Sequence, residues 1–167
     1  RDSVYGGGEG QEGHDLSAAE NHGGEVTYDT KVDISDDAKV RASVYGGGEL
    51  ALVGGDTYVT ISGGEIGRNE VKAKASDDPG YVMFGGATMG NVYGGGSGYI
   101  NTARSGQIYG NTNVTISQAE GKTTQIYHNV YGGGAYGTVG DFTYTMTKDT
   151  ETGTMKVTGI NGLHNER

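Results

Sequence analysis

The sequence of 167 residues contains no cysteine, no tryptophan and a single proline. Without cysteine the chain has no disulfide, no thiolate metal site and no thiol catalysis. Leu, Ile, Val and Phe make up less than a fifth of the residues, and with a net charge of −9 this composition is typical of disordered chains. The order of the residues argues against disorder, because the few apolar residues are clustered and repeated.

Long apolar runs are also missing. None reaches the roughly 18 residues of a membrane-spanning helix, so we expect no membrane span. The acidic charge argues against nucleic acid and anionic lipid as partners. Glycine, by contrast, is abundant, with 34 residues, but it does not occupy every third position, which excludes collagen.

The glycines belong to an internal repeat. The block VYGGG occurs four times, and its valines are Val4, Val44, Val92 and Val130. We therefore divide a single domain, residues 1–167, into repeat units 3–42, 43–90, 91–128 and 129–167. The repeated structural positions are Val4, Tyr5, Gly6, Val44, Tyr45, Gly46, Val92, Tyr93, Gly94, Val130, Tyr131 and Gly132.

A second block lies between successive VYGGG blocks. It spans residues 30–35, 57–62 and 112–117, and we interpret residues 142–147 as a degenerate fourth copy. Apolar β-branched residues alternate with polar residues, as in Val59-Thr60-Ile61, which predicts strands with one buried face.

These patterns predict an all-β fold, a β-solenoid or parallel β-helix of four imperfect repeats of about 38–48 residues. We expect about two coils in each repeat, since a coil takes roughly 20 residues, and coils stacked about 4.8 Å apart would form a rod roughly 40 Å long. The triple glycines are expected at tight corners, where they permit positive φ or close backbone approach. A four-bladed propeller or a sandwich is the alternative, because propeller blades have similar periods.

The VYGGG blocks, the VTIS-type strands and the GG corners together resemble the glycine-rich β-helical repeats of large surface or fibre proteins of Bacteroidetes. The resemblance covers nearly the whole chain. It implies an extracellular or cell-surface location and a fibre or adhesin, without implying an enzymatic activity.

The two ends of the chain suggest how copies could be joined. The chain begins at Arg1 and not at a Met, and we expect a piece of a longer protein. Joining Arg167 of one copy to Arg1 of the next would separate the last VYGGG block of one copy from the first of the next by one ordinary repeat length. The hypothesis is a filament subunit, a homopolymer stacked head to tail through uncapped ends. The alternative partner is the adjacent repeats of a longer chain.

Few residues suggest chemistry. The four VYGGG tyrosines could form a ladder, exposed for sugar stacking or rod packing, or buried as core. The acidic turns at residues 36–37, 77–78 and 149–151 carry oxygen ligands that calcium uses, but their spacing is not that of a calcium loop. We therefore expect no metal and no cofactor.

We expect a structural, non-enzymatic subunit or segment of an extracellular fibre. An adhesin-type module that binds a glycan or a host protein is the alternative. A polysaccharide-degrading β-helix enzyme is the weaker one, because it needs carboxylates beside a basic residue on one face. The candidates for such a group are Asp56, Glu65, Arg68 and Glu70.

Overall fold

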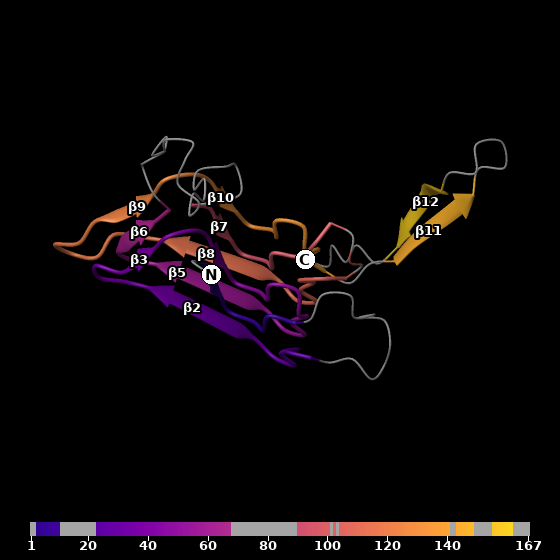
Figure 1. Cartoon of the computed structure of the whole chain (residues 1–167), viewed down its shortest axis with the longest axis horizontal. Helices are drawn as coiled ribbons and strands as arrows, with labels where there is room; N and C mark the ends of the chain where they lie inside the picture. Colours follow the sequence, from indigo (N-terminus) through magenta and orange to yellow (C-terminus); the bar gives the residue numbers. More distant parts are fainter. Residues whose placement is uncertain are drawn as a thin grey trace, which may run out of the picture.

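A computed structural model describes residues 3–10, 23–67, 90–100, 102, 104–140, 143–148 and 155–161. All regular secondary structure in these residues is β-strand. Strands β1 to β10 form three parallel sheets, and in each sheet the strands are stacked in chain order (Figure 1). Strands β11 and β12 form a separate antiparallel pair.

The first sheet is built from the four VYGGG blocks. Its strands are β1 (Val4–Tyr5), β4 (Val44–Tyr45), β7 (Val92–Tyr93) and β10 (Val130–Tyr131). Each valine pairs with the valine of the next block and each tyrosine with the next tyrosine. The repeated sequence is therefore in register across all four strands.

The second sheet contains the alternating block, in strands β2 (Thr30–Ile34), β5 (Thr57–Ile61) and β8 (Thr112–Ile116). Val32, Val59 and Val114 are register partners. In β2, Val32 and Ile34 are buried while Lys31 and Asp33 are exposed, as the alternation predicts.

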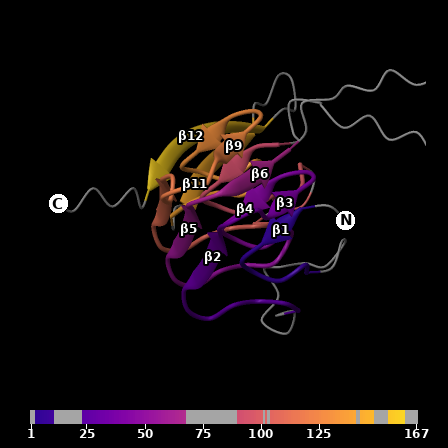
Figure 2. The ribbon, with the colours of Figure 1, turned by 90° about the vertical axis from the view of Figure 1, so that its left-hand side faces the viewer.

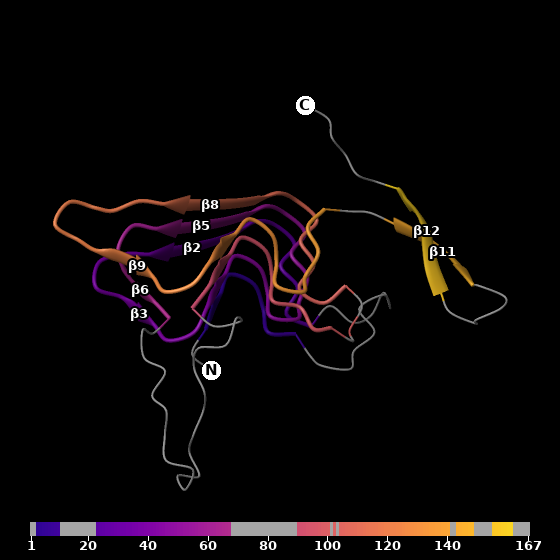
Figure 3. The ribbon, with the colours of Figure 1, turned by 90° about the horizontal axis from the view of Figure 1, so that it is seen from above.

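The third sheet is shorter, with strands β3 (Lys39–Val40), β6 (Gly64–Ile66) and β9 (Thr124–Ile126). A fourth column consists of single parallel bridges that link Val26, Val53, Ile108 and Val139. Successive repeats thus contribute segments to the same columns, and seen from above they follow the same path (Figure 3). This arrangement is compatible with the predicted β-solenoid.

The prediction of two coils per repeat is wrong. Val4 pairs directly with Val44, and Val44 with Val92, so an entire repeat separates neighbouring strands and forms one layer. The first layer contains β1 to β3, the second β4 to β6, and the third β7 to β9, while the fourth contains β10 and Val139. The described residues therefore form four layers instead of about eight, and the predicted rod is about twice too long.

The predicted fourth copy of the alternating block does not join the stack. Strand β11 (Thr143–Lys148) instead pairs antiparallel with β12 (Met155–Asn161). The residues of this copy do not suit the spacing used in the lower layers. Thr30, Thr57 and Thr112 each follow their bridge residue by four positions, and the same spacing from Val139 leads to Thr143. In a fourth layer, the inward positions would then be Thr143, Thr145 and Thr147, and the apolar residues between them would point outward. The apolar residues are one position out of phase, and a shift of one residue exchanges the two faces of a strand.

The core lies between the sheets of the layers. In Figure 2, β2 and β5 lie on one side and β1, β3 and β6 on the other. Val44 and Val92 of the first sheet pack with Val59 and Ile61 of the second and Ile66 of the third. The layers also approach closely at the triple glycines, where a Cβ on Gly46 would collide with the carbonyl oxygen of Gly94 in the layer above. The first glycine of the block is therefore needed for close approach, and its φ is not positive.

Candidate functional site

The residue before each VYGGG block helps to hold the layers in register. The backbone amide of Ser43 donates to the Ser3 hydroxyl at 3.3 Å, and the amide of Asn91 donates to the Ser43 hydroxyl at 3.2 Å. The Asn129 amide donates to Oδ1 of Asn91 at 3.0 Å. These side chains form a polar ladder that continues through all four layers.

Beside this ladder runs a row of four stacked tyrosines: Tyr5, Tyr45, Tyr93 and Tyr131. Neighbouring ring centroids are 4.9, 4.9 and 5.0 Å apart, and the rings lie within 13° of parallel. The spacing follows from the parallel register of the strands. Tyr45 and Tyr93 are buried, so the inner part of the row belongs to the packed interior and is not an exposed sugar-stacking surface.

Burial raises the pKa of the three lower tyrosines of this row, Tyr5, Tyr45 and Tyr93. It raises the pKa of Tyr5 from 10.0 to about 12, assisted by the negative charge of Glu49 and opposed by hydrogen bonds from Ser3 and Ser97. Tyr5, Tyr45 and Tyr93 therefore keep their phenolic protons to a higher pH than an exposed tyrosine does.

The upper end of the stack exposes apolar residues that are buried one layer below. Ile61 is fully buried, whereas its register partner Ile116 is 42% exposed. Val92 is fully buried, whereas Val130 is 45% exposed. Exposure of the tyrosine row likewise rises at its top residue, Tyr131. These residues form an apolar surface, which we call the open end.

The open end is stepped. The VYGGG column has four strands, whereas the β2-β5-β8 and β3-β6-β9 columns have three strands each among the described residues. A Cβ built on Gly46 meets Val59, and one built on Gly94 meets Thr112 and Val114. No described residue lies within 4 Å of a Cβ built on Gly132. The space above β8 and beside Gly132, which we call the fourth-layer site, is therefore open in the described structure.

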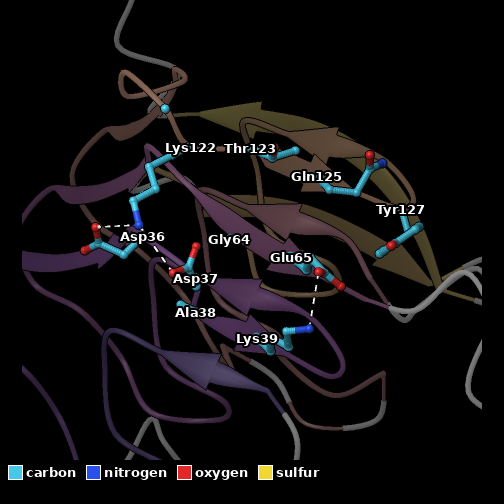
Figure 4. Close-up of a pocket in the computed structure, with 11 residues that line it drawn as sticks. Asp36, Asp37, Ala38, Lys39, Gly64, Glu65, Lys122, Thr123, Gln125 and Tyr127 are labelled. Carbon is cyan, nitrogen blue, oxygen red and sulfur yellow. Dashed lines mark hydrogen bonds and ion pairs between the residues drawn. The ribbon is translucent and has the colours of Figure 1, made fainter.

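A polar groove lies on the outer face of the β3-β6-β9 sheet (Figure 4). Its volume is about 440 Å³, and its walls include Lys39, Glu65, Gln125 and Tyr127. Lys39 Nζ lies 3.4 Å from Glu65 Oε1, so these two charges are paired across neighbouring layers. The groove thus combines an amide, a phenol ring and an exposed ion pair.

The acidic turn at residues 36–37 lies at one end of this groove. Lys122 of the third layer reaches both carboxylates, with Nζ 3.7 Å from Asp36 and 3.3 Å from Asp37. This turn is therefore engaged by a cation, and the described residues contain no cluster of metal-ligating side chains. The turns at 77–78 and 149–151 lie outside the described residues.

Of the suggested catalytic group, Asp56 and Glu65 lie within the described residues, and they do not line the same groove. Glu65 lines the groove and pairs with Lys39. Asp56 is not among the groove residues; it accepts a hydrogen bond from the Asn111 amide at 2.7 Å and one from the Tyr58 hydroxyl at 3.2 Å. Arg68 and Glu70 lie outside the described residues.

The bridge column was not predicted from the sequence, although a signal for it exists. Val26, Val53 and Ile108 each precede the first threonine of an alternating strand by four residues. The residue just before that threonine is Asp29, Asp56 or Asn111. Asp29 accepts the Asp56 amide at 2.8 Å, so this polar residue also links layers.

Comparison with protein-family models, curated proteins and solved structures finds no match for this chain. Among the described residues, none forms a helix that could span a membrane.

Proposed function

We propose that the chain is a β-solenoid segment of an extracellular or cell-surface fibre, with a structural and non-catalytic role, and that it extends by adding layers at its open end. The observation that carries the proposal is the loss of burial at the last layer. Ile116 and Val130 are exposed although their register partners Ile61 and Val92 are fully buried. A further layer would bury this apolar surface, as each layer does for the one below.

The backbone N–H groups at the open end point towards the place where a further layer would lie. In the VYGGG column, amides donate upwards: Val92 N to Asn129 O and Gly94 N to Tyr131 O, both at 2.9 Å. The corresponding donors of the top layer are the amides of Val130 and Gly132. An unpaired strand edge of this kind is a template for another strand.

The partner in this proposal is the lower end of a second copy. Its β1 carries the same Ser-Val-Tyr-Gly pattern that β4 places on β1 within one chain. On β10, Tyr5 of the second copy would stack on Tyr131 and Ser3 would donate its amide to Asn129, repeating contacts between existing layers. The contact joins unlike ends and does not close on itself, so it generates a filament.

Electron microscopy and light scattering of the purified chain over a concentration range test this proposal. We expect filaments with strands perpendicular to the axis. Val130→Pro removes one upward amide donor without touching a bond within the chain's own stack, and should abolish assembly. Val130→Ala keeps the amide and should still assemble. Wild-type protein that stays monodisperse at every concentration would refute end-to-end assembly.

The polar groove supports a second candidate function, an adhesin-type module that binds a glycan. A tyrosine ring beside amide and charged groups offers both stacking and hydrogen bonding to a sugar. A glycan array probed with wild-type protein and with Tyr127→Ala tests this alternative. Binding that is lost in the variant would favour it, and no binding to any glycan would remove it.

A further inference from the structure

The fourth-layer site lies where a fourth strand of the β2-β5-β8 sheet would lie. Its floor is β8, the last strand of its sheet among the described residues. Val114 and Ile116 face it from below, and the open side of Gly132 faces it from the side. In each lower layer the corresponding space beside the glycine is filled by a valine, namely Val32, Val59 or Val114.

The chain's own next strand is out of register for this site. In the second layer, Gly54, Gly55 and Asp56 connect bridge residue Val53 to the inward Thr57. After Val139 the chain has a single glycine, so its aspartate comes one residue early, and in a fourth layer the apolar residues of this segment would fall on the outward face. Strand β11 pairs with β12 instead of joining this sheet.

We propose that the fourth-layer site accepts an extended strand from another polypeptide, parallel to β8, with the pattern Thr-x-Val-x-Ile. The valine of the added strand would lie above Val114 and its isoleucine above Ile116. The same residues are paired between β2 and β5 and between β5 and β8. This inference deepens the proposed fibre function, on which it rests, because direct docking of a second copy on β10 leaves one layer of this column unfilled.

The bonds that would hold the strand are repeated below it. The Thr30 amide donates to Asp56 O at 3.0 Å, and the Thr57 amide donates to Asn111 O at 2.9 Å. The corresponding donor in β8 is the amide of Thr112, which needs a carbonyl from the residue before the incoming threonine. Backbone bonds of this type give affinity to an added strand, and alternate side chains give specificity.

A synthetic peptide with the sequence of residues 55–63, GDTYVTISG, is the direct probe. Amide hydrogen exchange of the full-length protein should slow at residues 112–116, by about tenfold at a peptide concentration ten times Kd. The matched control is GDTVYITSG, which has the same composition but presents its apolar residues one position out of phase. Equal protection by both peptides, or by neither, would overturn the proposal.

Three protein variants make the test specific. Ile116→Lys places a charge at an exposed position of the site and should abolish peptide binding, while Thr115→Lys on the outer face of the same strand should retain it. Inserting one glycine after Gly140 should bring the chain's own β11 into phase and block the peptide. Filaments that form without peptide binding would reject this inference alone, and binding without filaments would reject end-to-end assembly alone.

Discussion

The position of a residue in the stack should decide what its truncation costs, and Ile61 and Ile116 form a matched pair for measuring this. Both are isoleucines at the same place in neighbouring strands, but one is fully buried and the other is at the open end. Ile→Ala in a packed core costs about 2–5 kcal/mol, the sum of lost transfer free energy and a cavity. We expect Ile61→Ala to fall in the middle of that range.

At Ile116 both contributions are smaller. The side chain is 42% exposed, so nearly half of the transfer term is absent, and a cavity open to solvent carries little further cost. We expect a loss of about 1.4 kcal/mol for Ile116→Ala, from roughly 0.8 kcal/mol for each of the carbons removed, reduced by the exposed fraction. Urea unfolding of dilute, monomeric protein measures both. Equal losses of unfolding free energy would refute the exposure of Ile116 at the open end, since they would require Ile116 to be covered as completely as Ile61.

Two further predictions concern the layers and the tyrosine row. Gly46→Ala should destabilise the protein by about 1–3 kcal/mol, because its Cβ would collide with the layer above. Gly132→Ala faces open space and should change the unfolding free energy by less than about 0.5 kcal/mol. Equal effects in urea unfolding would contradict the assignment of Gly132 to an open edge. The raised pKa of Tyr5 should make the stability of the fold decrease as pH rises from 10.0 towards about 12, because Tyr5 loses its phenolic proton at lower pH in the unfolded chain. Unfolding followed by circular dichroism should show a smaller loss of stability over this pH range for Tyr5→Phe. An unchanged loss of stability in this variant would contradict the prediction.

Much of this architecture could be predicted from the sequence, because identical blocks in a parallel stack must meet in register. The alternation in residues 57–62 predicts which side chains of β5 are buried, and Val59 and Ile61 are buried. The four VYGGG blocks predict a row of tyrosines, which the structure contains. These features depend on local pattern and on repetition, and both are visible in a single sequence.

The number of layers could not be predicted in the same way. A coil length of about 20 residues assumes that each turn uses short corners, but here the connection from one column to the next differs between repeats. The segment from Val4 to Val32 in the first layer is nearly twice as long as the equivalent segment from Val44 to Val59 in the second. Such connections contribute no repeated pattern, so only the strand pairing reveals that a full repeat forms one layer.

The third sheet was missed for a related reason. Its strands are two or three residues long, and the aligned segments around Val40, Ile66 and Ile126 share little except one apolar residue. A strand this short has no measurable period, so its existence depends on the neighbouring columns that hold it in place. The same dependence applies to the open end: β8 lacks an upper neighbour within the described structure, and Ile116 is exposed for that reason.

The fourth repeat shows how a small change in spacing alters a repeat fold. Up to Gly140 it follows the layers below: the Ile108 amide donates to Thr138 O at 2.9 Å and the Gly140 amide donates to Ile108 O at 2.8 Å. With one residue fewer before the strand, its apolar residues would fall on the outward face of a fourth layer. Strand β11 pairs antiparallel with β12 instead of joining the sheet. Because the VYGGG column has already reached the fourth layer at that point, the described part of the stack ends in a step. At this step the edge of β8 has N–H groups that can bond another strand, and apolar side chains beside it are exposed. A strand from another chain could pair with this edge and cover these side chains at the same time.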